Sequence, residues 1–440
     1  MELLDFARET VDEATKAGAE FADVSAGRGR HISVEVENGS IRSTDVGRTD
    51  SLKLRAFIGG GRGTVSISGL EALDTSPADL ARQAVETARA ADGDPDFRSL
   101  PPFEEHEEVE GLHDEKVEAL APADAVEIAG RAVDEARAVD PETIVMAGVS
   151  ISAGIGAIAN SLGVALERPS SRIEHSVFAV IRRGDDTGAF YDFDAGRNLD
   201  DVDLPPVGKN AAQGALAFLG AQKIATKHMP VVLGPLSAYS LLKTLAGAAN
   251  AESIQRKRSY LVGKQGEKIG SEKFTLTDDA FVPRGLSSGA YDAEGALRRR
   301  VAIWQEGRFA AMLHNSYTAG KAGAENNGHA TRSGGIAPTN VFIELGDRTA
   351  AEIIAGVDEG LYINLGSLSI HPTSGDISTS VDFGYKIEKG KLAYPVANAM
   401  VAGHVFDLLA GIEAVSSDYR SEPGAVMPTV LISKMDVAGG

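Results

Sequence analysis

Cysteine is missing from all 440 residues of the chain. Its absence excludes disulfide bonds, thiolate metal ligands and a cysteine nucleophile. The sequence also lacks an apolar run of about 18 residues, the length that a membrane-spanning helix needs. Residues 1–18 have the spacing of an amphipathic helix and not the basic-then-apolar order of an export signal. We therefore expect a cytoplasmic protein that does not enter membranes.

Basic side chains are in the minority. The chain has 43 Lys and Arg residues against 63 Asp and Glu residues, which gives a formal net charge of -20. An acidic surface repels phosphate backbones and anionic lipid headgroups, so nucleic acid and membranes are not expected as primary partners. With 43% hydrophobic residues, the chain is long enough for two or three domains with sizeable cores.

The sequence shows no residue spacing typical of a common hydrolase. No serine is tied by spacing to a histidine and a carboxylate, and no two of the nine histidines lie one helical turn apart. His106 and His113 lie in an acidic segment, which is either a weak surface metal site or, as its composition favours, a solvated loop. The glycine cluster at 59–63 leads into another strand rather than a helix, so it predicts a hairpin turn and not a phosphate loop.

Two short charged motifs have alternative interpretations. The run Arg298-Arg299-Arg300 can clamp a carboxylate or a phosphate, because guanidinium groups pair with oxyanions through two N–H bonds. A solvated strand face explains the same run. Asp292 and Glu294, two residues apart, would point to the same side of a strand, where they share a proton, order a partner or only close a turn.

Changes of hydrophobic period divide the chain into four parts. The predicted parts are an N-terminal α/β unit at 1–95, an acidic linker at 96–118, a second α/β unit at 119–222 and a strand-rich part at 223–440. We place the main boundary between Leu204 and Lys227. In the last part, helical spacing predicts long helices at Leu236–Gln255 and Asn398–Leu409.

An ordered series of short motifs in the second half resembles the TldD/PmbA family. In chain order the motifs are Arg258-Ser259-Tyr260-Leu261, Gly285-Leu286-Ser287-Ser288, Tyr291 to Gly295, Asn315 to Ala319, Pro338-Thr339-Asn340, Gly375 to Ser378, Ala402-Gly403-His404 and Met435 to Gly439. With the turn Val36-Glu37-Asn38-Gly39, the resemblance spans nearly the whole chain. It implies an α+β fold, with N-terminal helices on a mixed β-sheet and C-terminal curved antiparallel sheets that form a barrel-like cavity.

The sequence departs from the metal-binding members of that family. In TldD-type members an HExxxH helix and a C-terminal cysteine hold zinc. The matching helix is Tyr239–Glu252, and the two histidine positions fall near Leu242 and Gly247, neither of which can bind a metal. The segment that matches the cysteine, Ser416–Pro428, contains none. The resemblance therefore implies the PmbA/TldE type, without a catalytic residue or a metal ligand of its own.

This type implies a non-metallated subunit of a metallopeptidase complex. A TldD-type partner would carry the zinc, and an extended or unfolded peptide would bind as an added β-strand in a cavity between the subunits. Asn340, His371 and Ser378 are the expected substrate contacts, because they lie in or beside the family-like motifs. A role as turn-stabilising polar residues is the alternative for all three.

Two other functions stay open. The chain can act alone, as a homodimer that binds peptides without hydrolysing them. It can also be a peptidase whose metal site is built from His314, His371 or His404 with an acidic residue, although no pair of them has a spacing suited to one ion.

Overall fold

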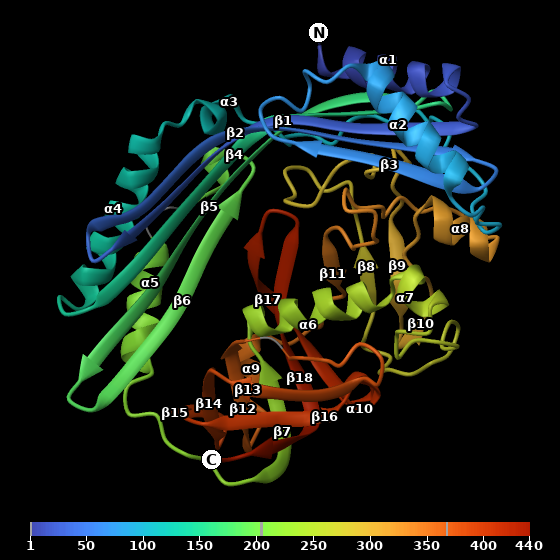
Figure 1. Ribbon diagram of the computed structural model, residues 1–440. Helices are drawn as coiled ribbons and strands as arrows, with labels where there is room; N and C mark the ends of the chain where they lie inside the picture. The colour runs from blue at the N-terminus through green and yellow to red at the C-terminus, as the bar shows by residue number, and fades with distance from the viewer. Residues whose placement is uncertain (1, 203–205, 367) are drawn as a thin grey trace.

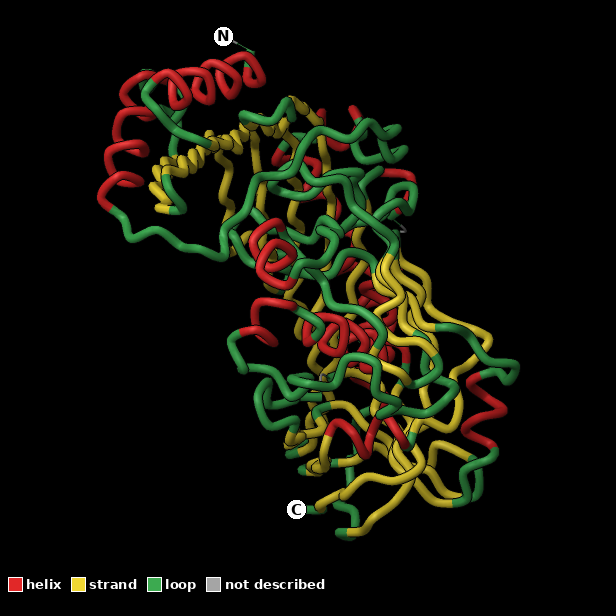
Figure 2. Tube along the Cα trace, turned by 90° about the vertical axis from the view of Figure 1, so that its right-hand side faces the viewer, coloured by secondary structure: helices red, strands yellow, loops and turns green. Residues whose placement is uncertain are grey.

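The computed structural model describes residues 2–202, 206–366 and 368–440. An arched N-terminal sheet with helices on its outer face lies over a C-terminal body of smaller sheets and helices (Figure 1). The two termini lie at opposite ends of the molecule (Figure 2). Leu204, at one end of the predicted boundary, lies outside the described residues.

The N-terminal sheet has six strands in the described residues, in the order β3-β2-β1-β4-β5-β6. The strands are β1 (Phe21–Glu37), β2 (Ser40–Ile58), β3 (Gly61–Ser68), β4 (Ile144–Asn160), β5 (Ala165–Arg183) and β6 (Asp186–Gly196). All neighbouring strands are antiparallel. Because β1 pairs with β4, the strands from 1–95 and 119–222 form one continuous sheet.

Helices pack on the outer face of this sheet in two groups (Figure 1). They are α1 (Leu3–Lys16) and α2 (Pro77–Ala90) at one end, α4 (Pro122–Val139) and α5 (Pro206–Ala217) at the other, with α3 (Glu115–Ala119) and a 3-10 turn (Leu199–Asp201). The even-numbered apolar residues of β1 are buried beneath them, Val24 and Ala26 with the first group and Ile32 and Val34 with the second. Successive strand residues alternate between faces. The odd-numbered residues of β1 therefore face the inside of the arch.

The C-terminal body is built around two sheets. The larger one curls into a half-barrel with the order β13-β16-β18-β7-β12-β14-β15, and β17 pairs with β18. Its strands are β7 (Lys227–Leu233), β12 (Glu359–Leu365), β13 (Asp376–Val381), β14 (Phe383–Glu388), β15 (Lys391–Val396), β16 (Ala399–His404), β17 (Ile412–Glu422) and β18 (Ala425–Ala438). The smaller sheet consists of β8 (Leu276–Asp278), β9 (Val301–Gln305), β10 (Arg308–Phe309) and β11 (Val341–Ile343).

The α+β class predicted from the sequence is confirmed, with one difference in strand pairing. Parallel pairing was expected in the N-terminal sheet, but the parallel strands β7 and β12 lie in the larger C-terminal sheet. The same part of the chain contains the short helices α8 (Ser316–Ala322) and α9 (Ala350–Ala355). Among the described residues, none of the helices combines the length and the hydropathy needed to cross a bilayer.

One long predicted helix is interrupted in the structure. The segment forms α6 (Pro235–Ala248) and then α7 (Ala251–Gln255). Between them, the side chain of Asn250 accepts hydrogen bonds from the backbone N–H groups of Glu252 and Ser253, at 2.9 and 3.2 Å. Asparagine is among the most favourable N-cap residues. The side chain of Asn250 therefore starts a new helix instead of continuing the old one.

The predicted helix Asn398–Leu409 was wrong over its first half. Its residues 399–404 form β16, which pairs with both β13 and β18, and α10 (Val405–Ala410) begins only afterwards. The ring of His404 accepts the backbone N–H of Phe406 at 3.2 Å and so caps this short helix. Pairing with strands on both sides overrode the helical spacing of the apolar residues.

A buried charge cluster joins the two halves of the molecule. Arg55 on β2 donates through Nε to Asp23 on β1, at 2.9 Å, and through Nη1 to Glu294 of the C-terminal body, at 3.0 Å. The exposed fractions of these side chains are only 13%, 8% and 7%. A second link lies at the edge of the arch, where Arg420 on β17 pairs with Asp192 on β6 at 2.7 Å. These contacts fix the sheet over the body.

Replacing Arg55 by methionine should destabilise the fold by about 3–5 kcal/mol, because two buried carboxylates lose their counter-charge. Urea unfolding, followed by circular dichroism and by the fluorescence of Trp304, the single tryptophan, measures the loss. Arg42→Gln is the control, because the ion pair of Arg42 with Glu37 is exposed, and its effect should stay within about 0.5 kcal/mol. Equal unfolding midpoints for the two variants would show that the buried cluster does not join the halves.

Candidate functional site

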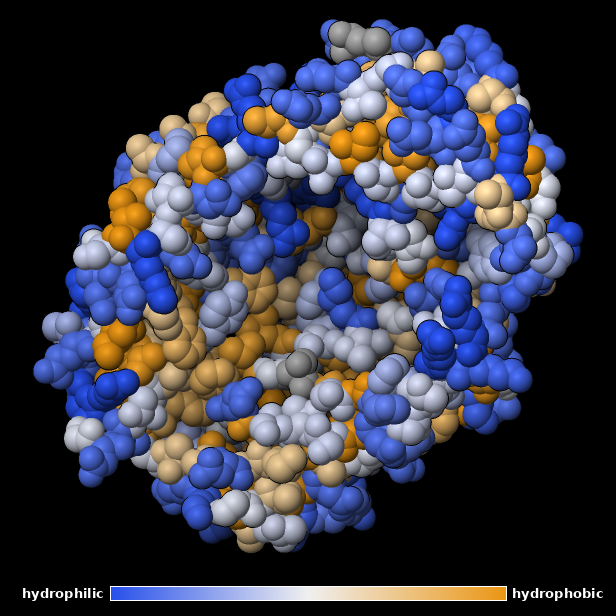
Figure 3. All heavy atoms as spheres, in the orientation of Figure 1, coloured by the Kyte–Doolittle hydropathy of each residue, from blue (hydrophilic) through white to orange (hydrophobic). Residues whose placement is uncertain are grey.

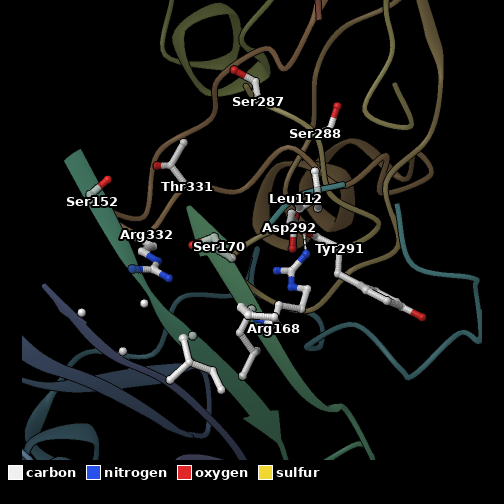
Figure 4. A pocket seen from close by; sticks show the side chains of 18 of the residues that line it. Leu112, Ser152, Arg168, Ser170, Ser287, Ser288, Tyr291, Asp292, Thr331 and Arg332 are labelled. Carbon is white, nitrogen blue, oxygen red and sulfur yellow. Dashed lines mark hydrogen bonds between the residues drawn. The ribbon is translucent and has the colours of Figure 1, made fainter. Parts of the chain in front are cut away.

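A cavity of about 630 Å³ lies where the inner face of the N-terminal sheet meets loops of the C-terminal body. Its floor comes from the middle of β1, β4 and β5, and its walls come mainly from the segments 287–298 and 329–338. The space-filling view shows the molecule hollowed between the arch and the body (Figure 3). Figure 4 shows the cavity from close by.

The floor of the cavity is smooth because glycine occupies four neighbouring positions. Gly27 and Gly29 on β1 pair in register with Gly156 and Gly154 on β4. A Cβ atom on Gly156 would lie 2.8 Å from Nη2 of Arg332. The missing side chains therefore make room for a guanidinium group on the floor. Sequence reasoning missed this feature, although glycine two residues apart inside a long strand is a known sign of close approach.

Asp292, at the wall of the cavity, and Glu294, two residues further on, have different roles. Asp292 accepts the backbone N–H groups of Glu294 and Ala296 on Oδ1, at 2.8 and 3.0 Å, and that of Ala330 on Oδ2, at 2.9 Å. It therefore closes a turn, whereas Glu294 orders Arg55. Burial, with the nearby charge of Glu294, raises the pKa of Asp292 to about 7.

The histidine at the wall is held on both sides. Nε2 of His329 lies 3.0 Å from Oδ1 of Asp278, and Nδ1 lies 3.0 Å from Oδ1 of Asn327. Neither ring nitrogen is left to bind a metal or to activate a serine. Among the described lining residues no serine hydrogen-bonds to a histidine.

The structure does not bring the three predicted substrate contacts together. Asn340 accepts the N–H of Ser287 at 3.2 Å and donates to Oγ of Ser288 at 2.8 Å, so it holds the loop that lines the cavity. His371 and Ser378 lie at β13, the outer strand of the larger sheet, and do not line the cavity. Substrate binding by the three residues stays a prediction.

Two of the three histidines considered for a metal site do lie near each other. Oγ of Ser374 is 3.0 Å from Nδ1 of His371, and the carbonyl of Ser374 is 2.9 Å from Nε2 of His404. Nδ1 of His404 already accepts a backbone N–H, which uses the one lone pair of a neutral imidazole. His314 lies elsewhere, beside α8. Across 2–202, 206–366 and 368–440, no three His, Asp or Glu residues are grouped to hold a metal.

The resemblance predicts that two positions on α6 correspond to the histidines of a zinc-binding helix. Leu242, on α6, is 1% exposed and packs in the C-terminal core. Gly247 lies near the end of α6, and a Cβ atom there would meet nothing within 4 Å. The segment that matches the cysteine region, Ser416–Pro428, forms the outer part of the β17–β18 hairpin. Both positions on α6 therefore lack a donor atom.

The raised pKa of Asp292 predicts a pH-dependent stability. Because the folded-state pKa of about 7 lies above the ordinary value of 3.8, the folded protein binds this proton more tightly than the unfolded chain. The contribution is present below pH 4 and is lost as the pH rises through 7. Between pH 4.5 and 7, the stability of the wild type relative to Asp292→Asn should fall by at most about 1.4 kcal/mol per pH unit.

Urea unfolding of both proteins at several pH values measures this difference. Asp185→Asn, which removes an exposed carboxylate from the β5–β6 turn, gives the baseline for a general change of charge. A difference between wild type and Asp292→Asn that stays constant, or that grows with pH, would contradict the raised pKa.

Comparisons with known proteins agree with this architecture. The sequence matches the PmbA/TldA metallopeptidase domain 1 over residues 22–90, the central domain over 115–219 and the C-terminal domain over 226–439. It is 26% identical over 448 aligned residues to Metalloprotease PmbA of Escherichia coli O157:H7, covering 99% of this chain and 96% of that one.

Two solved structures share the fold. TldE from Thermococcus kodakarensis has a TM-score of 0.88 at 23% identity, covering 99% of this chain and 100% of its own. A Bacteroides thetaiotaomicron protein named as a candidate modulator of DNA gyrase has a TM-score of 0.88 at 24% identity, covering 99% of this chain and 98% of its own. With all three parts of the sequence matched, the chain belongs to the PmbA/TldD metallopeptidase family.

Proposed function

We propose that this chain is a non-metallated subunit of a PmbA/TldD-type metallopeptidase complex and that it binds extended or unfolded peptides. The observation that carries the proposal is on α6, where Leu242 is buried in the core and Gly247 has no side chain at the two expected histidine positions. A catalytic zinc site needs about three protein ligands and an open position for water. The proposal therefore assigns the zinc to a TldD-type partner.

The chemistry of amide hydrolysis allows the two subunits of such a complex to have different roles. Zinc on the partner would lower the pKa of a bound water to about 7 and so supply a nucleophile at neutral pH. This chain would hold and orient the peptide backbone, a task that needs no nucleophile of its own. A cytoplasmic location stays a prediction.

An open strand edge supports the peptide-binding part of the proposal. The β17–β18 hairpin stands in the space between the arch and the body (Figure 1). One edge of β17 pairs with β18. On the other edge, the described residues contribute only a bridge between Ser416 and Arg348. An extended peptide can add to such an edge through backbone hydrogen bonds, which depend little on its sequence.

The first test uses the purified chain alone and mixed with a TldD-type protein from the same organism. Zinc content and cleavage of an unfolded peptide are measured in each sample. We expect about one zinc per heterodimer, with hydrolysis only in the mixture. Zinc and hydrolysis from this chain alone would overturn the proposal and favour a site at the histidines. Peptide binding without hydrolysis in any mixture would favour the homodimeric binding protein.

A second test asks whether the free edge of β17 holds the peptide. Tyr419 pairs with Pro428, which has no N–H group, so the N–H of Tyr419 points away from β18 in the alternating antiparallel pattern. Tyr419→Pro removes that outward donor and should weaken peptide binding about tenfold. Tyr419→Ala removes the same side chain but keeps the N–H, and it is the matched control. Equal affinities for the two variants would exclude this edge.

A further inference from the structure

Arginine dominates the charged side chains around the cavity. The lining residues include one aspartate, Asp292, and six arginines: Arg28, Arg30, Arg168, Arg197, Arg298 and Arg332. The side chains of Arg28 and Arg30, at even-numbered positions of β1, lie on the outer face of the sheet. Four arginines and one aspartate therefore set the charge of the cavity, whereas the whole chain carries a formal charge of -20. Clefts with low-dielectric walls concentrate the field of such a cluster and attract ions of the opposite charge.

Three of the six arginines are bound mainly by other parts of the protein. Arg28 pairs with Asp50 at 3.2 Å. Arg30 donates to backbone carbonyl oxygens at the end of α3. Arg197 donates to three backbone carbonyl oxygens in neighbouring segments. Arg28 therefore has a counter-charge, whereas Arg30 and Arg197 are held by carbonyl groups, and Nε of Arg30 is buried without a hydrogen-bond partner.

The other three arginines have no counter-charge in contact. Nη1 of Arg168 and Nε of Arg298 both donate to the carbonyl oxygen of Tyr291, at 3.0 and 3.2 Å. Arg332 lies over the floor at Gly156. Among the described residues no carboxylate forms an ion pair with any of these guanidinium groups. Several of their N–H groups are therefore free to bind a ligand in the cavity.

The electrostatics agree with this geometry. Burial, and then the neighbouring charge of Arg298, lowers the pKa of Arg168 to about 10, and burial also lowers the pKa of Arg298. The carboxylates of Glu108 and Asp292 act on Arg168 in the opposite direction without restoring its ordinary pKa. Figure 4 shows Arg168 reaching from its strand towards Asp292. With a pKa of about 10, the guanidinium group of Arg168 stays charged at neutral pH.

The three arginines of the run Arg298-Arg299-Arg300 have different surroundings in the structure. Arg299 pairs with Glu104 at 2.7 Å, and Arg300 pairs with Asp279 at 3.5 Å. Arg298 alone of the three lines the cavity. The two interpretations of the run therefore apply to different residues. Arg299 and Arg300 form ion pairs with carboxylates, whereas the guanidinium group of Arg298 faces the cavity and can bind an oxyanion.

We infer that the cavity binds an oxyanion, a carboxylate or a phosphate group, between Arg168, Arg298 and Arg332. Guanidinium groups bind both through paired, charge-assisted N–H bonds. A volume of about 630 Å³ is in the range of small-molecule sites, so the oxyanion is part of a larger ligand. The two sources are the free C-terminus of a peptide and a small phosphorylated molecule. The inference stands without the proposed function, because it involves no partner and no zinc.

Calorimetry on the full chain at low ionic strength, where screening is weak, tests this inference. The probes are inorganic phosphate, pyrophosphate, a pentapeptide with a free C-terminal carboxylate and the same pentapeptide as its amide. We expect at least one oxyanion probe to bind, and Arg332→Gln to weaken that binding about tenfold. Binding of the free acid but not of the amide identifies a peptide end, and binding of phosphate or pyrophosphate identifies a phosphorylated ligand.

Two further variants distinguish binding at this arginine cluster from a general effect of the protein's net charge. Arg8→Gln removes an exposed arginine on α1 and should leave the affinity unchanged. Gly156→Ala keeps every charge but places a Cβ atom 2.8 Å from Nη2 of Arg332, so it should weaken binding as well. The inference is overturned if no oxyanion probe binds, or if Arg332→Gln and Arg8→Gln have the same effect.

Discussion

The strict alternation of side chains along β1 and β4 determines how the rest of the molecule is arranged. Their outward residues are apolar, except for Arg28 and Arg30 on β1, and are covered by two groups of helices. Their inward residues near the middle are small, so the backbone itself forms the surface that faces the C-terminal body. An antiparallel sheet that is covered by helices on one face can leave its other face to water or to another part of the protein. Here that face meets the loops of the body and encloses the cavity between them.

The buried arginine at Arg55 completes this arrangement. It joins one carboxylate of the sheet to one carboxylate of the body in a place where water is excluded. A charged group in such a site fixes the position of its partners closely, because any displacement leaves a charge without a counter-ion. The cavity next to it can therefore keep a defined shape even though its floor and its walls come from different parts of the chain.

Local sequence patterns predicted much of the fold, and long-range pairing decided the rest. The helices α1 and α2 and the turn at Asn38 were predictable, because each depends on neighbouring residues. The pairing of β1 with β4 was not, because it joins strands that are distant in the chain. The strand β16 replaced a predicted helix for the same reason. Asn250 is a favourable N-cap residue and so could have predicted the start of α7, but the helical spacing of the apolar residues on both sides of it favoured one continuous helix.

The candidate site was less predictable than the fold. Arg298 attracted notice as part of an arginine run, but Arg168 and Arg332 lie in unrelated segments and meet only in the folded chain. The resemblance to a known family pointed to two positions on α6, Leu242 and Gly247, where it implies histidine ligands in the metal-binding members. It gave no information about an arginine cluster that spans the two halves.

Substitutions in the glycine-rich floor of the cavity and substitutions in the loops above it should have different effects. At Gly154 a Cβ atom would collide with the carbonyl oxygen of Arg28, so the backbone of β1 excludes a larger residue there. At Gly156 a Cβ atom would meet the flexible end of Arg332, so a larger residue there would displace a guanidinium group and not the sheet. The upper boundary consists of loops, whose side chains can be exchanged without altering the sheet. What the cavity accepts should therefore depend on the loops and on Arg332 more than on the backbone of the sheet.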